Sequence, residues 1–401
     1  MTIGVSDSFW RRASDAPDFV LPRIGWFWLA LALGVGLRVG VFVYACLYPI
    51  SNEEGVVVSP LILQSTTDFH TYTEAANVLR SADFGTFLGA VENPVRDGND
   101  MYLRDFLQPL MPLLIIATDY REGNTLPLAT VFLLVSCCAF LIWLEILRRV
   151  DLPGYWLVAF ALLPTPLWFA INMTLDSLLS FTLVVFYFLY FIQTDLKHRF
   201  LILCVSALLI MMTRSNGIFL LGFLIADLLF FKTLSRRQIV PMAVFLTVIA
   251  GIVVFLFWPL YAFELNKATV AHTTFGLTQQ QWLAGVVSWL PDPLDQVVSW
   301  LGYAVAKFLY FCGLRPSFAD TEGWKLLLRA APGLIVFPGL LFLFFAGEVR
   351  QRLFVLCYMF PIFGHLPQDR YSLAIQPLLF LYGARCFEGL RARLAGGGRT
   401  A

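Results

Sequence analysis

The sequence predicts an all-helical protein that is embedded in a membrane, and three observations predict it. Hydrophobic residues make up 59% of the 401 residues and charged residues only 14%, whereas a soluble domain has about 25% charged residues. Apolar runs recur along the whole chain, each near the roughly 20 residues that a helix needs to cross a bilayer. The runs lack the alternation of polar and apolar residues that membrane strands show.

The apolar runs divide the chain into about ten expected crossings within one integral membrane domain over residues 1–401. Basic loops such as the one with Arg148 and Arg149 belong inside under the positive-inside rule, which leaves both termini in the cytoplasm. The expected spans are residues 24–50, 126–147, 155–170, 175–192, 200–212, 218–231, 240–261, 326–345, 353–364 and 373–386.

Two longer stretches remain as outer loops. Residues 51–118 are rich in acidic and poor in basic residues, which fits the outer side. They end in a brief apolar piece, residues 107–118, which we expect to be an interfacial or re-entrant helix. Residues 262–325 form the second outer loop, and we expect residues 297–314 to lie in it as an interfacial helix, because a crossing there would put the basic C-terminal tail outside.

The first outer loop also contains a predicted surface helix. Thr71 and Glu74 fit a capping box at its start. The helix is too short and too polar to span, so it should lie on the membrane surface. Its apolar face is formed by residues at helical spacing: Tyr72, Ala75, Ala76 and Leu79.

Several polar residues are candidates for chemistry, and each also has a purely structural interpretation. Arg38 lies inside the first span, where a charge is costly, so it needs a partner on a neighbouring helix or a water-filled cavity. Asp68 could cap the helix that follows it, and His70 could be a surface histidine. Asp68 and His70 could bind a divalent metal, but a third ligand is not identifiable, so the signal is weak and we assign no metal ligands. Arg214 and Arg370 could be interfacial arginines that extend to the headgroups.

Together the outer residues favour the transfer of a sugar from a polyprenyl-phosphate carrier. A carboxylate such as Asp68 would take the proton from the acceptor hydroxyl as its oxygen attacks the anomeric carbon. Arginines at the same depth would stabilise the leaving phosphate through bidentate hydrogen bonds. One base suffices for a single inverting displacement, whereas a covalent route would need a second carboxylate.

Four short motifs carry a resemblance. They are Asp68-x-x-x-Tyr72-x-x-Ala75, Gln108-Pro109-Leu110, Thr213-Arg214-Ser215-Asn216-Gly217, and Asp369-Arg370-Tyr371 followed by Pro377. Their order resembles the GT-C superfamily of membrane glycosyltransferases over roughly residues 24–390. In that family similar motifs form the acidic first juxtamembrane helix, a proline-bearing second juxtamembrane segment, a Thr-Arg-x-x-Gly turn and a late Arg-Tyr…Pro motif.

The resemblance implies a GT-C-like fold with outer-face juxtamembrane helices. It implies Asp68 as the catalytic carboxylate, assisted by His70, and a lipid-phosphate sugar as donor with no resident cofactor, a divalent metal being left open. The residues that it implies for substrate binding are Tyr72, Arg214, His365, Asp369, Arg370 and Tyr371. Phe69 and His70 stand where relatives often have a second acid, and Gln108 stands where they have a proline. These departures leave the donor sugar, the acceptor and the subfamily open.

The expected partners are a polyprenyl-phosphate-linked sugar, a glycan or lipid acceptor and membrane lipids. The net charge of +1 argues against nucleic acid. We expect an integral protein of a bacterial inner or plasma membrane with its active site on the extracytoplasmic side. Two alternatives remain: an O-antigen-type polymerase or ligase, and a transporter of a lipid-linked saccharide, which would place charges at mid-membrane.

Overall fold

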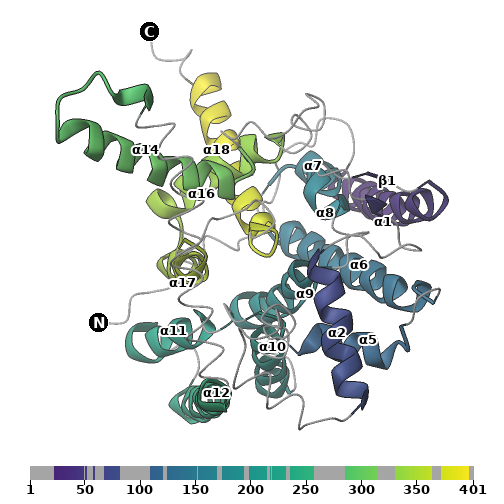
Figure 1. Ribbon diagram of the computed structural model, residues 1–401. Helices are drawn as coiled ribbons and strands as arrows, with labels where there is room; N and C mark the ends of the chain where they lie inside the picture. The colour runs from purple at the N-terminus through teal and green to yellow at the C-terminus, as the bar shows by residue number, and fades with distance from the viewer. Residues whose placement is uncertain are drawn as a thin grey trace.

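The computed structural model describes residues 22–48, 50–51, 57–58, 67–81, 109–120, 124–150, 152–168, 174–193, 198–214, 217, 219–231, 235–256, 285–314, 330–363 and 372–396. Within these residues the fold is helical, as predicted (Figure 1). The exception in the described part is a two-residue antiparallel ladder between β1 (Ile50–Ser51) and β2 (Val57–Val58).

Three helices are long and apolar enough to cross a membrane: Arg23–Leu47, Leu126–Arg148 and Leu175–Ile192. The predicted membrane-helix class is therefore supported, while the number of crossings stays a prediction. The helices are α1 (Arg23–Leu47), α2 (Thr67–Ser81), α5 (Leu110–Ala117), α6 (Leu126–Arg148), α7 (Tyr155–Ala161), α8 (Pro164–Trp168), α9 (Leu175–Tyr187), η1 (Phe188–Ile192), α10 (Arg199–Thr213), α11 (Phe219–Ala226), η3 (Asp227–Phe231), α12 (Arg236–Leu256), α14 (Leu294–Phe311), α16 (Gly333–Ala346), α17 (Val349–Phe363) and α18 (Gln376–Gly396), of which η1 and η3 are π-helical.

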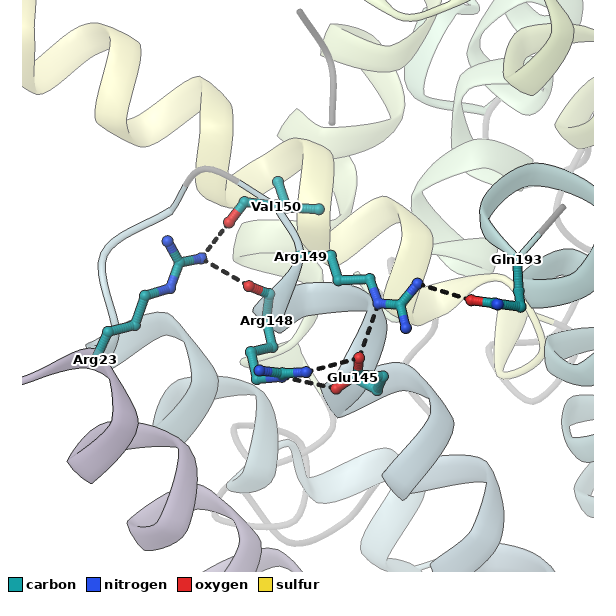
Figure 2. Close-up of polar contacts among 6 residues, drawn as sticks. All are labelled: Arg23, Glu145, Arg148, Arg149, Val150 and Gln193. Atoms are coloured by element: carbon teal, nitrogen blue, oxygen red, sulfur yellow. Dashed lines mark hydrogen bonds and ion pairs between the residues drawn. The ribbon is translucent and has the colours of Figure 1, made fainter. Parts of the chain in front are cut away.

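One end of the bundle is held by arginines, and we call it the basic end. Glu145, in the last turn of α6, accepts hydrogen bonds from Arg148 Nε at 2.7 Å and from Arg149 Nε at 2.8 Å (Figure 2). Arg149 Nη1 also donates to Gln193 Oε1 at 3.1 Å, just after η1. Arg23, which begins α1, donates to the backbone oxygen of Arg148 at 3.2 Å. The start of α1 and the ends of α6 and η1 therefore meet at this end.

A second set of contacts brings α7 and α18 to the same end. Glu388 accepts hydrogen bonds from Trp156 Nε1 at 2.9 Å and from the Tyr155 hydroxyl. Arg391 Nη1 donates to the Tyr155 oxygen at 3.2 Å. Because α7 also packs against α1, the start of α7 and the C-terminal part of α18 belong to the basic end.

Stacked and edge-to-face aromatic rings fill the core between α9, η1, α11 and α17. Phe223 contacts Phe354 with ring centroids 5.2 Å apart, and Phe219 contacts Tyr358 at the same separation. This pairing makes α11 and α17 antiparallel. Tyr190 joins the cluster from η1, 5.1 Å from Phe223.

Helices α16 and α18 cross at two glycines, Gly339 and Gly383. A Cβ at Gly339 would overlap the backbone oxygen of Leu379, and one at Gly383 would overlap that of Ile335. Without these Cβ atoms the two backbones touch, as in membrane helix pairs with small residues at the crossing.

The surface helix predicted in the first loop is α2. Tyr72, Ala75 and Ala76 are buried and Leu79 is half-buried, so the predicted apolar face is confirmed. The capping box was wrong: α2 begins at Thr67, which puts Thr71 inside the helix, where its backbone N–H no longer needs a cap.

The span predicted over residues 155–170 is not one helix in its described part. It consists of α7 and α8, separated at Leu162 and Leu163. Pro164 explains the break, because a proline cannot donate the hydrogen bond that would continue α7, whereas it is well tolerated where a new helix begins.

Candidate functional site

The end of the bundle opposite the basic end is organised by an apolar cluster that docks α2. Tyr72 is 4% exposed and packs in this cluster. Arg80 secures the other end of α2, because its Nη2 donates to the backbone oxygens of Ile115 at 3.2 Å and Tyr120 at 3.0 Å. The cluster comprises Phe42, Ala45, Tyr72, Ala76, Met111, Ile115, Tyr120, Leu128, Ala129, Phe132, Leu175 and Leu178.

The cluster joins the last turns of α1 to the first turns of α6 and α9, and α2 lies along α5 beside them (Figure 1). We call this end the docking end. Asp68 and His70 lie in the first turn of α2, and their side chains are outside the described part of the chain. Tyr72 is one turn further along and shares the cluster with Leu175, the residue before Asp176. The first turn of α2 is thereby tied to the start of α9.

A buried ion pair lies at the docking end. Asp176, in the first turn of α9, accepts a hydrogen bond from Arg214 Nη1. The side chain of Asp176 is 5% exposed and that of Arg214 is 18% exposed. Each charge therefore replaces part of the hydration that the other loses on burial. Arg214 is the residue that follows α10, and the pair therefore joins the end of α10 to the start of α9.

The backbone after Arg214 explains the glycine of the Thr-Arg-x-x-Gly motif. Gly217 N donates to the Arg214 backbone oxygen at 2.8 Å. A Cβ at Gly217 would lie 2.7 Å from the Ile210 backbone oxygen, closer than real Cβ atoms approach. A residue without a side chain is therefore required where the chain turns back over the end of α10.

Arg38 lines a cavity, which is one of the two environments expected for it. Its side chain is 3% exposed. Nη1 donates to the Gly34 backbone oxygen at 2.8 Å, Nε donates to Ser136 Oγ at 3.3 Å, and the guanidinium lies 4.3 Å from the centre of the Phe140 ring. No carboxylate of the described residues forms an ion pair with it.

The cavity has a volume of about 30 Å³ and reaches the docking end. Leu373 and Pro377, at the start of α18, lie in its wall, as does Ser177, which follows Asp176. It is lined by Arg38, Ser136, Ala139, Phe140, Trp143, Phe160, Pro166, Ser177, Ser180, Leu373 and Pro377.

The structure gives a mixed account of the predicted site residues. Tyr72 is in the docking cluster, where it packs, and Arg214 is paired with Asp176. The other four substrate-binding candidates, His365, Asp369, Arg370 and Tyr371, lie outside the described residues. Ser372, the next residue, is described and buried.

In the sequence, Asp176 stands at the start of the expected span 175–192, but no local pattern identifies Arg214 as its partner. The available signal was that a carboxylate in an apolar helix needs a partner. Ser177, Ser180 and Trp143 were not predicted as cavity residues either, because single serines in apolar runs carry no pattern. Among the residues that the structure describes, no three His, Cys, Asp or Glu side chains are grouped so as to hold a metal ion.

No family model, no curated protein and no solved structure matches the chain.

Proposed function

We propose that the chain is a membrane glycosyltransferase with a GT-C-like arrangement of about ten crossings. It would move a sugar from a polyprenyl-phosphate carrier to an acceptor hydroxyl. The docking end would face the extracytoplasmic side, and the basic end, with Arg23, Arg148, Arg149 and Arg391, would face the cytoplasm in accordance with the positive-inside rule.

One observation carries the proposal. The helix α2, whose first turn contains Asp68, is fixed through Tyr72 and its apolar cluster to the same end of the bundle as the Asp176–Arg214 pair and the Arg38 cavity. A candidate base and a buried cation from distant parts of the sequence are thus held at one end of the protein. This supports transfer from a lipid phosphate, which needs a base and an anion-stabilising group near the same anomeric carbon.

The proposed step is a single displacement. The Asp68 carboxylate accepts the proton of the acceptor hydroxyl, and the acceptor oxygen forms a bond to the anomeric carbon. The bond between that carbon and the phosphate oxygen breaks, and its electron pair leaves with the polyprenyl phosphate. His70 would assist Asp68, and Arg370 would bind the leaving phosphate. Arg214 would act mainly through its ion pair, by fixing the ends of α9 and α10.

The test is a transfer assay on the purified full-length protein in liposomes. The donors are polyprenyl phosphates linked to single hexoses or pentoses, membranes of the source cells supply the acceptor, and released polyprenyl phosphate is quantified by mass spectrometry. We expect Asp68→Asn to lower turnover by about 100-fold or more, the range that general-base catalysis contributes. Glu74→Gln is the matched control, because Glu74 is an exposed acid on the same helix. Release at the wild-type rate by Asp68→Asn would refute the assignment of the base.

The transporter alternative keeps one supporting observation, the buried Arg38 inside a long apolar helix. The same liposomes distinguish the two. A transporter would move the lipid-linked sugar to the other leaflet unchanged, whereas the proposed enzyme releases polyprenyl phosphate. Release of a polyprenyl diphosphate would instead indicate an O-antigen-type polymerase or ligase.

A further inference from the structure

The Arg38 cavity contains more hydrogen-bond donors than the protein itself satisfies. Arg38 has five N–H donors, of which Nη1 and Nε engage Gly34 and Ser136. Within the described chain, Nη2 makes no hydrogen bond. Trp143 also lines the cavity, and its buried indole N–H has no partner among the described residues. The hydroxyl of Ser180 lies in the same wall.

The charge in the cavity is unbalanced. Among the lining residues that the structure describes there is no aspartate or glutamate, and Arg38 is the one ionised group among them. A buried cation without an anion is strongly unfavourable in a protein interior, because the lost hydration is not replaced. The contact of its guanidinium with the Phe140 ring, at 4.3 Å from the ring centre, offsets only a part of this cost. A ligand that brings a negative charge would complete the site.

The position of the cavity indicates from which side of the bundle such a ligand would enter. Ser177 is the third residue of α9, so the cavity begins at the first turn of that helix, next to the Asp176–Arg214 pair. The helix N-terminus adds a partial positive charge there. The Leu373 and Pro377 side of the wall lies just after the Asp369-Arg370-Tyr371 motif. The exposed side chains of α1, including Val39 and Val43, show that this part of the bundle borders its apolar outer surface.

The size of the cavity restricts the ligand. A volume of about 30 Å³ is two to three times what one water molecule requires. This is room for the oxygens of one small oxyanion. A phosphate offers acceptors only, which matches the guanidinium, the indole N–H and the hydroxyl, and arginine binds phosphate oxygens through its planar fork.

We propose that Arg38 and the cavity around it bind the phosphate group of a polyprenyl-phosphate lipid. The identity of this lipid rests on the proposed function. Arg38 then takes a phosphate-binding role for which Arg214, already paired with Asp176, is less suited. The lipid tail would lie along the apolar face beside α1, and the phosphate would enter the bundle between α1, α6, α9 and the start of α18.

The experiment measures binding and needs no sugar transfer. The full-length protein is placed in nanodiscs of zwitterionic lipid, and its affinity for a short-chain polyprenyl phosphate is measured by microscale thermophoresis. The same polyprenol without phosphate, inorganic phosphate and an anionic phosphatidylglycerol serve as separate probes. We expect the polyprenyl phosphate to bind about tenfold or more tightly than each of these three.

The variants assign the binding to the cavity. We expect Arg38→Gln to weaken polyprenyl-phosphate binding by about tenfold or more, because a charge-assisted hydrogen bond is lost. Arg38→Lys, which keeps the charge but not the fork, should weaken it less, and Ser180→Ala should weaken it by a smaller factor. Arg391→Gln is the control, because Arg391 is 58% exposed at the basic end. Size-exclusion profiles show which variants fold.

The outcomes separate the site from the proposed function. Wild-type affinity for polyprenyl phosphate in the folded Arg38 variants would overturn the proposal. If Arg38→Gln does not fold, the affinities of Arg38→Lys and Ser180→Ala decide the question in the same way. Equal binding of the polyprenol, of inorganic phosphate or of phosphatidylglycerol would also overturn it. If Asp68→Asn retains transfer while Arg38-dependent binding persists, the catalytic assignment fails and the lipid-phosphate site stands.

Discussion

Asp176 and Arg214 form a buried ion pair although 38 residues separate them in the chain. Asp176 lies in the first turn of α9, and Arg214 directly follows the last residue of α10. The two helices also pack along their length, so the pair fixes their ends at the same level. Helix α9 contributes to two further features of the docking end, since Leu175 and Leu178 belong to the cluster that holds α2, and Ser177 and Ser180 line the cavity.

We therefore expect Asp176→Asn to destabilise the protein by about 3–5 kcal/mol, the range for leaving one partner of a buried pair unpaired. Arg214→Gln should cost a similar amount or less, because Arg214 is the more exposed partner. The double variant should be more stable than the sum of the two single effects predicts. Unfolding midpoints in detergent measure all three. Additive losses would mean that the two side chains do not interact in solution.

The crossing of α16 and α18 gives a prediction that does not involve the site. Gly339→Ala places a methyl group against the Leu379 backbone oxygen and the Gly383 nitrogen, and overpacking of this kind is unfavourable by about 1–3 kcal/mol. Gly40→Ala is the matched control, since a Cβ at Gly40 of α1 has no neighbour within 4 Å. That control should be neutral or slightly stabilising. A fall in thermal midpoint for the control but not for Gly339→Ala would contradict the crossing.

Local patterns predicted the helices well where each residue carries its own signal. The apolar runs predicted α1, α6 and α9 nearly to their ends, and the spacing of Tyr72, Ala75 and Ala76 predicted the buried face of α2. The error at residues 155–170 came from weighing hydropathy above Pro164, although proline ends a helix whatever the hydropathy of its neighbours.

The site was harder to predict because its contacts are non-local. Arg38 was recognised as a charge that needs an explanation, but its position over Phe140 and beside Ser136 depends on how α1 packs on α6. The pairing of Asp176 with Arg214 likewise depends on how α10 packs on α9. Hydropathy predicts how deep a residue lies in the membrane. Which side chains it contacts at that depth depends on how the helices pack against one another.

Tyr72 tests whether the predicted substrate contact or the observed packing describes its role. We expect Tyr72→Ala to release α2 from the docking end, because a buried aromatic replaced by alanine is unfavourable by about 3–5 kcal/mol, and transfer should be lost with it. Tyr72→Phe keeps the ring in the cluster, so turnover and KM should stay within about threefold of wild type. A Tyr72→Phe variant that folds but has a KM raised more than tenfold would instead assign its hydroxyl to the substrate.

The two ends of the bundle must face opposite sides of the membrane if the proposed orientation is correct. Asn124, before α6 at the docking end, and Ser235, before α12, are both exposed. Ser235 precedes Arg236 and Arg237, which the positive-inside rule assigns to the same side as the basic end. In a variant whose seven free cysteines are replaced by alanine, we expect Asn124→Cys to react with a membrane-impermeant maleimide on intact spheroplasts. Ser235→Cys should react only after permeabilisation, because it lies beside the basic residues that remain inside. Reaction of both cysteines from the same side would show that the docking end and the basic end do not face opposite sides of the membrane. The proposed placement of Asp68 beside an external acceptor would then be wrong.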